Sequence, residues 1–166
     1  MNVVVHDTPV GPLHLASDGS ALVACEFDGH ERGLAHRLWR EGTRGHADPL
    51  LDRARAELDD FFRGSLRRFT VPVAPRGTDF QREVWAALRE IPYGETLSYG
   101  ALASRIGRPA AVRAVGAANG QNPVCIVVPC HRVIGADGSL TGFGGGLPRK
   151  RYLLALERGE RPLMMA

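Results

Sequence analysis

The sequence predicts two structural units: an α/β unit with a small antiparallel sheet over residues 1–75, and a mostly helical unit over residues 76–166. Two observations support this division. Short alternating segments between turn formers occur near the N-terminus, and helical periodicity with recognisable caps dominates the second half. Pro72, Pro75 and Gly77 lie between the two patterns, as expected for a linker.

Composition excludes several classes of protein. A chain of 166 residues with 44% hydrophobic and 23% charged residues is globular and can bury a substantial core. No apolar run reaches the ~18 residues of a membrane span. The first residues contain no basic segment followed by a long apolar one, so we expect a cytoplasmic protein that does not contact membranes. Three cysteines are too few, and odd in number, for a disulfide framework.

The elements of the first unit follow from alternation and turn signals. The pattern predicts short antiparallel strands at residues 3–5, 13–16 and 21–27. Asp18-Gly19 is a tight-turn signal between the last two. A helix is predicted over residues 51–62, where apolar residues share one face, and a further strand over residues 69–73. Residues 30–50 carry turn formers and predict no element.

The second unit begins with helices. Thr78 and Gln81 have the spacing of a capping box, and an apolar stripe continues to Ile91. Ser98 is placed to cap a second helix, and a third follows over residues 110–119. Two short helices joined by a tight, glycine-containing turn are typical of a helix-turn-helix.

The third helix, residues 110–119, consists almost entirely of small side chains. Arg113 is its one long side chain, and Val112 and Val115 are expected to point inward. Such a helix lacks the polar side chains that read base edges, but its backbone can approach a grooved partner closely. Residues 76–166 carry a net charge of +5, which favours a polyanionic partner. A helix packed inside the core, with Arg113 at its rim, is the alternative.

A candidate reactive centre follows the turn at Asn122-Pro123. Residues 124–128 are predicted as a short buried strand, and Cys130 and His131 come soon after it. A nearby imidazole or cation lowers the pKa of a thiol and produces the reactive thiolate. A final amphipathic helix carries Glu157, which could orient His131 and complete a Cys-His-Glu relay.

This segment resembles a known family. Pro129-Cys130-His131-Arg132-Val133, with Asn122-Pro123 before it and residues 142–146 after it, is similar to the active-site block of the O6-alkylguanine-DNA alkyltransferases, the methylated-DNA–protein-cysteine methyltransferases. The similarity extends from about Thr78 to Glu157. It implies a ribonuclease-H-like first unit and a winged helix-turn-helix-like second unit.

The resemblance also implies roles for individual residues. Cys130 would accept the alkyl group, His131 would take its proton through a water, and Glu157 would hold His131. Asn122 would brace the segment around the thiol. Tyr99 would lie by the target nucleotide, turn its phosphate and donate a proton as guanine leaves.

The same resemblance implies a DNA surface and a base pocket. Residues 110–119 would lie in the minor groove, and Arg113 would fill the gap left by a flipped nucleotide. The implied DNA contacts are Ser98, Tyr99, Arg113, Ala114 and Gly116. The implied pocket residues are Asn119, Val133, Phe143 and Gly144, with the loop 135–146 as a wall. Family members often carry Tyr and Ser where this chain has Phe143 and Gly144, so the hydroxyl contacts to the base differ here.

The chemistry of such a reaction is consistent with the residues present. An alkylated base inside a duplex must be flipped out before sulfur can reach it. Transfer of a methyl group to a thiolate needs no cofactor and no metal. Cys125 is expected to face away from Cys130 by strand alternation, so no second thiol resolves the thioether and each molecule reacts once. We expect a monomer that binds duplex DNA containing O6-alkylguanine and that can do so cooperatively.

Three other interpretations were compared with this one. A cysteine hydrolase could use Cys130, His131 and Glu157, but Pro129 has no N–H to offer an oxyanion. A non-catalytic damage sensor could use the same helices, but relatives without alkyl transfer lack the acceptor cysteine. Cys25 and His30 have ligand types that suit zinc, yet no matching partners are evident among the other histidines of the first unit, which are His6, His14, His36 and His46. We therefore expect solvated histidines.

Overall fold

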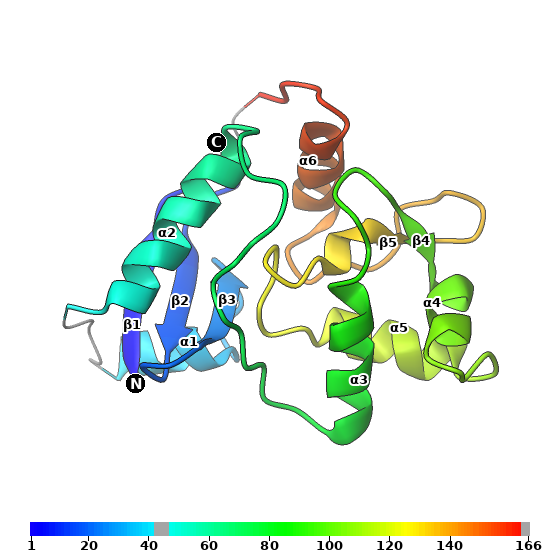
Figure 1. Ribbon diagram of the computed structural model, residues 1–166, viewed down its shortest axis with the longest axis horizontal. Coiled ribbons are helices and arrows are strands. Elements are labelled where there is room, and N and C mark those ends of the chain that lie inside the picture. The colour runs from blue at the N-terminus through cyan, green and yellow to red at the C-terminus, as the bar shows by residue number, and fades with distance from the viewer. Residues whose placement is uncertain (42–46, 164–166) are drawn as a thin grey trace.

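The first unit is built on a three-stranded antiparallel sheet. In the computed structural model, which describes residues 1–41 and 47–163, the strands are β1 (Asn2–His6), β2 (Leu13–Ser17) and β3 (Leu22–Phe27), in the order β1-β2-β3 (Figure 1). The three predicted strands are thus confirmed. Side chains alternate across the sheet, so Leu13 and Leu15 enter the main core while His14 and Ala16 face the opposite side.

Two helices cover the two faces of this sheet. α2 (Pro49–Phe62) packs Leu51 and Leu58 against the face that carries Leu15, and Asp48 caps its N-terminus. α1 (Leu34–Arg40) covers the other face and was not predicted. Its N-cap, Gly33, has no side chain, and the cap comes instead from Glu26 on β3, which accepts hydrogen bonds from Ala35 N and His36 N at 3.3 and 3.2 Å. A cap so distant in sequence leaves no local signal.

Two short segments pair with the outer edge of β3, and each replaces a predicted strand. The prediction of a strand over residues 69–73 was wrong, since only Val73 forms a bridge, to Leu22. The prediction over residues 124–128 was also wrong. Val124 bridges Cys25, and the chain then turns sharply at Ile126, whose φ is +72°. Prolines before each bridge remove N–H donors, which stops longer pairing.

The second unit is a winged helix-turn-helix, as predicted. α3 (Asp79–Leu88) begins at the predicted capping box, in which Gln81 N donates to Thr78 Oγ1 and Thr78 N donates to Gln81 Oε1. The remaining elements are β4 (Leu97–Ser98), α4 (Tyr99–Arg105), α5 (Val112–Gly120), a 3₁₀ turn (Cys130–Arg132), β5 (Val133–Ile134) and α6 (Leu147–Glu157). β4 and β5 pair in parallel, and α4 and α5 form the helix-turn-helix (Figure 1).

α5 is held by its inner side only. Trp85 of α3 donates an indole hydrogen bond to Ala118 O at 2.8 Å, and Val115 is fully buried. Val112 was expected to point inward, but it is 39% exposed because it is the first residue of the helix and lies beyond the packing of α3. The opposite side of α5, with Val112, Arg113, Ala114 and Ala117, is exposed.

One hydrophobic core runs through both units. It joins Leu15 and Phe61 of the first unit to Val84 and Leu153 of the second. Arg149 of α6 adds a polar tie, donating to Val10 O at 2.8 Å. Across the described residues, no helix is both long and apolar enough to cross a membrane.

Candidate active site

Cys130 lies where the two units meet. It is the first residue of the 3₁₀ turn that follows Pro129, and it is 3% exposed. Its amide donates to Val128 O at 2.9 Å, which closes the turn and fixes the backbone under the thiol. A cysteine in such a place is held in one position by backbone geometry and has little contact with solvent.

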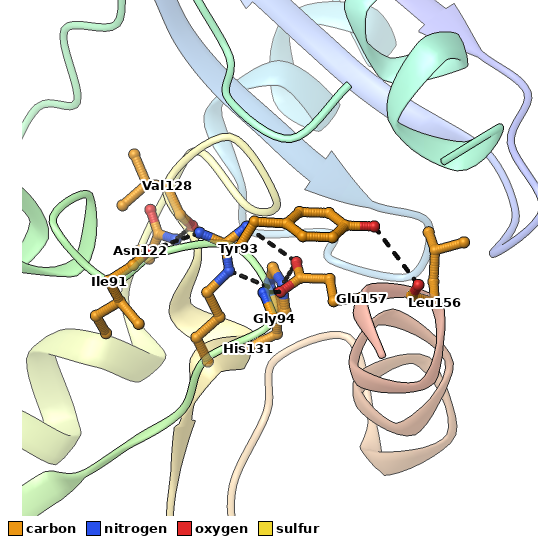
Figure 2. A network of polar contacts seen from close by, with 9 residues as sticks. Ile91, Tyr93, Gly94, Asn122, Val128, His131, Leu156 and Glu157 are labelled. Atoms are coloured by element: carbon orange, nitrogen blue, oxygen red, sulfur yellow. Dashed lines mark hydrogen bonds and ion pairs between the residues drawn. The ribbon is translucent and has the colours of Figure 1, made fainter. Parts of the chain in front are cut away.

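His131, the residue after Cys130, belongs to a buried polar network centred on Glu157 (Figure 2). His131 Nε2 is 2.6 Å from Glu157 Oε2, and Arg132 binds both oxygens of Glu157 at 2.8 and 3.0 Å. Gly94 N donates to the same carboxylate at 3.1 Å. Although burial acts to raise it, hydrogen bonds from His131 and Arg132 hold the pKa of Glu157 at about 2. Glu157 is therefore an anion whose charge is balanced mainly by Arg132.

The network sets the tautomer of His131. Since an ionised carboxylate only accepts hydrogen bonds, Nε2 of His131 carries the proton and donates it to Glu157. Burial lowers the pKa of His131, which keeps the ring neutral. Its Nδ1 is buried, has no partner among the described residues, and carries the lone pair. His131 can thus act as a base through Nδ1.

Two asparagines hold the backbone around the thiol. Asn122 donates to Val128 O at 2.8 Å and accepts from Val124 N at 3.0 Å, so it spans the turn that precedes Pro129. Asn119, at the end of α5, donates to Cys130 O at 3.4 Å. Both are almost fully buried. They connect the end of α5 to the position of the thiol.

The surroundings of Cys130 favour its thiolate. Hydrogen bonding from the Cys125 thiol lowers the pKa of Cys130 most, burial opposes it, and Asn122 and the positive charge of Lys150 lower it further. The pKa of Cys125 is raised well above its usual value, so Cys125 remains a proton donor. The prediction that Cys125 faces away from Cys130 was wrong, because the segment turns at Ile126 instead of continuing as a strand.

Lys150 is a buried cation of this site. It is the only lysine of the chain and is fully buried in α6. Its Nζ donates to Val133 O at 2.6 Å and to Thr141 O at 3.0 Å, which ties the loop 135–146 to the helix. Its being the single lysine of an arginine-rich chain is the only sequence signal for this role. Arg132, part of the segment 129–133, neutralises Glu157.

A small cavity of about 20 Å³, room for roughly one water molecule, adjoins Cys130. Of the predicted pocket residues, Asn119, Phe143 and Gly144 line it, and Val133 does not, since its side chain is buried in β5. Glu26, Phe27 and His30 from the first unit also line it, which nothing in the sequence indicated. The first unit therefore forms part of the site's wall.

A wider surface depression of about 450 Å³ adjoins this cavity. The two share four lining residues, which are Gly120, Gly142, Phe143 and Gly144. The wider depression is also lined by Tyr99, Val112, Gly116 and Thr141. Tyr99 Oη donates to Thr141 O at 3.3 Å. Gly116 brings α5 against the Tyr99 ring, where an added Cβ would lie 3.7 Å from it. The depression thus lies beside α5 and borders the cavity that Cys130 lines.

Of the predicted DNA-contact residues, Tyr99 and Gly116 line this depression. Arg113 and Ala114 are exposed on the first turn of α5. Ser98 caps α4, its Oγ accepting from Ala101 N at 3.0 Å, and it places Tyr99 at the start of that helix. The fold and the site together define a helix-turn-helix protein with an enclosed, activated cysteine behind its second helix.

Comparison with known proteins identifies the family. Family models described as the ribonuclease-like domain and the DNA binding domain of 6-O-methylguanine DNA methyltransferase match residues 3–75 and 79–159. Methylated-DNA–protein-cysteine methyltransferase of Mycobacterium bovis is 51% identical over 157 residues, 94% of this chain and 92% of the relative. That of Methanosarcina acetivorans is 46% identical over 158 residues, 95% of this chain and 98% of the relative.

Solved structures agree. A crystal structure of Mycobacterium tuberculosis OGT in complex with DNA has a TM-score of 0.87 and 47% identity, covering 98% of this chain and 96% of that one. The chain belongs to the 6-O-methylguanine DNA methyltransferase family. Its activity is transfer of a methyl group from methylated DNA to a protein cysteine, which repairs DNA by direct reversal.

Proposed function

We propose that this chain flips O6-alkylguanine out of duplex DNA through the minor groove and transfers the alkyl group irreversibly to its own Cys130. The observation that carries the proposal is the position of the Cys130 thiol. Cys130 lines a small cavity that shares four lining residues with the depression beside α5, and the residue after it, His131, is a neutral histidine held by an ionised carboxylate. The chain's partner is the alkylated duplex, and a monomer in the cytoplasm, able to bind DNA cooperatively, is its working form.

The proposed reaction is a direct transfer of the alkyl group from O6 of guanine to sulfur. The Cys130 proton passes to His131 Nδ1 through one water, and Glu157 stabilises the imidazolium that results. The thiolate attacks the alkyl carbon, a C–S bond forms, and the C–O6 bond breaks with its electrons returning to the guanine ring. Tyr99 supplies a proton to the departing base. The product is a thioether. Its C–S bond is not cleaved by a base such as His131, so the transfer is irreversible.

DNA recognition is proposed to rest on shape. The exposed face of α5 carries Arg113, Ala114 and Gly116, which allow close approach to a groove but offer few groups to read bases. Arg113 is long enough to occupy the gap of a flipped nucleotide. Phosphate contacts from the basic second unit supply the remaining affinity.

The cavity adjoining Cys130 is too small for a purine. Its volume of about 20 Å³ accommodates a water molecule, so the wall formed by the loop 135–146 must move when a base enters. Lys150 anchors one point of that wall, at Thr141 O. Glycines at 142, 144, 145 and 146 give the segment beyond this anchor backbone freedom.

Intact mass after mixing with a duplex that contains one O6-methylguanine tests the proposal. We expect a gain of one methyl group on the Cys130 peptide, saturating at one per chain, and none in Cys130→Ser, which should still bind the duplex. No gain with tight binding would favour the damage-sensor alternative. No gain and no binding would favour the cysteine hydrolase. A methyl group on Cys125 would contradict the assignment of the acceptor.

A further inference from the structure

Two histidines of the first unit face each other between the sheet and α1. His14 projects from β2 on the side away from the main core, and His36 projects from α1. Their ring centroids are 4.5 Å apart and their planes are inclined by 43°. They lie 22 positions apart in the sequence and meet only because α1 folds over the sheet.

Both imidazoles have an unused nitrogen. Nδ1 of His14 and Nδ1 of His36 are buried, and neither has a hydrogen-bond partner within the described part of the chain. Unsatisfied buried polar atoms are rare in folded proteins and are destabilising. His14 is itself almost fully buried, at 6% exposed. A neutral imidazole has one ring nitrogen whose lone pair can bind a metal ion.

A carboxylate completes the cluster. Asp28 follows the end of β3, and one ligand atom each from His14, Asp28 and His36 lies within 4.8 Å of the other two. Ligands of a tetrahedral zinc ion lie about 3.4 Å apart, because the metal–ligand bonds are about 2.0–2.2 Å long. Small side-chain rotations would bring the three atoms to that spacing. Asp28 is exposed, so the fourth position opens to solvent.

We propose that His14, Asp28 and His36 form a binding site for one divalent transition-metal ion of the zinc type. Two imidazole nitrogens and one carboxylate oxygen suit zinc, cobalt or nickel, whereas magnesium and calcium prefer oxygen ligands alone. The ligands come from three consecutive elements, so the ion joins α1 to the sheet. It also fixes the segment between Asp28 and α1, which includes His30 in the wall of the Cys130 cavity.

The site explains how α1 is retained. The helix has only seven residues, too few to be stable alone, and the Glu26 carboxylate and His36 are among the groups that hold it to the sheet. Metal coordination adds a further link at His36. This inference is independent of the repair reaction, because no ligand of the ion touches Cys130.

The test is titration of the chelator-treated full chain with Zn²⁺, followed by native mass spectrometry and thermal unfolding. We expect one tightly bound Zn²⁺ per chain and a rise in Tm of about 5–10 °C at 100-fold excess over Kd. His36→Gln should weaken binding by at least about 100-fold and Asp28→Asn by about tenfold or more. Because Asp28 is exposed, Asp28→Asn keeps the fold, which circular dichroism can verify.

His6→Gln is the matched control. His6 pairs with Asp59 at 2.7 Å but has no second imidazole beside it, so its loss should leave Zn²⁺ affinity unchanged. Cys130→Ser should also bind Zn²⁺ normally. The proposal is overturned by absence of saturable binding, by equal binding of Mg²⁺, by equal losses in His6→Gln, or by loss of binding in Cys130→Ser, which would place the metal on thiols.

Discussion

A second thiol, that of Cys125, lies beside Cys130 and lowers its pKa. Cys125→Ala removes the hydrogen-bond donor that contributes most to lowering the pKa of Cys130. We expect the pH profile for reaction with free O6-benzylguanine to shift to higher pH, with a slower rate at neutral pH. The free base is the appropriate probe because it requires no DNA binding.

Cys125→Ser is the control for this prediction. Its hydroxyl is also a donor and should restore most of the rate at neutral pH. Identical pH profiles for the parent protein and Cys125→Ala would show that Lys150 and Asn122 alone set the pKa of Cys130.

Two adjacent glycines of the loop 135–146 should respond differently to the same change. A Cβ at Gly144 would meet only Gly120 O, at 3.9 Å, whereas a Cβ at Gly145 would lie 2.6 Å from the Phe27 ring. Gly144→Ser should therefore leave Tm almost unchanged and add a hydroxyl beside the base. Gly145→Ser should destabilise the fold by roughly 1–3 kcal/mol through overpacking. Equal urea midpoints for the two variants would contradict this account of the wall.

The exposed face of helix α5 carries mostly small side chains and one cation, Arg113. Arg113→Ala should slow repair of duplex DNA by about 10–100-fold, since filling the flipped nucleotide's gap offsets a few kcal/mol of unstacking. Reaction with free O6-benzylguanine should stay unchanged because no base is flipped. Arg105→Ala, at the end of α4, is the matched control and should alter salt dependence more than rate. Equal losses of Arg113→Ala on both substrates would remove the wedge role.

At the scale of the whole molecule, acid should unfold this protein through its buried network. Burial lowers the pKa of His131, so below about pH 6.5 the unfolded chain gains a proton that the folded chain does not. The pKa of Glu157 is about 2, so its contribution is complete above about pH 4.5 and is lost as the pH falls toward 2. The free energy of unfolding should thus decrease as the pH falls below about 6.5, and decrease further as the pH falls from about 4.5 toward 2.

Urea midpoints at pH 7, 5 and 3 measure this dependence. Glu157→Gln should cost about 3–5 kcal/mol at pH 7, because Arg132 is left buried without its partner, and should flatten the decrease below about pH 4.5. If the urea midpoint of Glu157→Gln fell as much as that of the parent protein between pH 4.5 and 3, other carboxylates would govern acid unfolding.

Local patterns predicted the sheet, the capping box and the helix-turn-helix, because each depends on residues close in sequence. They failed where a distant group determines the structure. α1 is capped by Glu26 across the sheet, and residues 124–128 turn at Ile126 to place Cys125 beside Cys130. The resemblance indicated Cys130, His131 and Glu157, which lie together. It gave no sign of Lys150's contact with the loop 135–146, nor of His30 in the wall.

The pairing on the outer edge of β3 bears on aggregation. Cys25 N donates to Pro123 O and Cys125 N donates to Cys25 O, both at 2.9 Å, while residues 72–74 cover the Leu22 end. An uncovered strand edge is a template on which other chains add as strands. The segment that positions the acceptor thiol thus also shields the β3 edge of the sheet from strand addition. Chemical damage that displaces residues 123–125 from β3 would therefore abolish repair and also expose a strand edge that promotes aggregation.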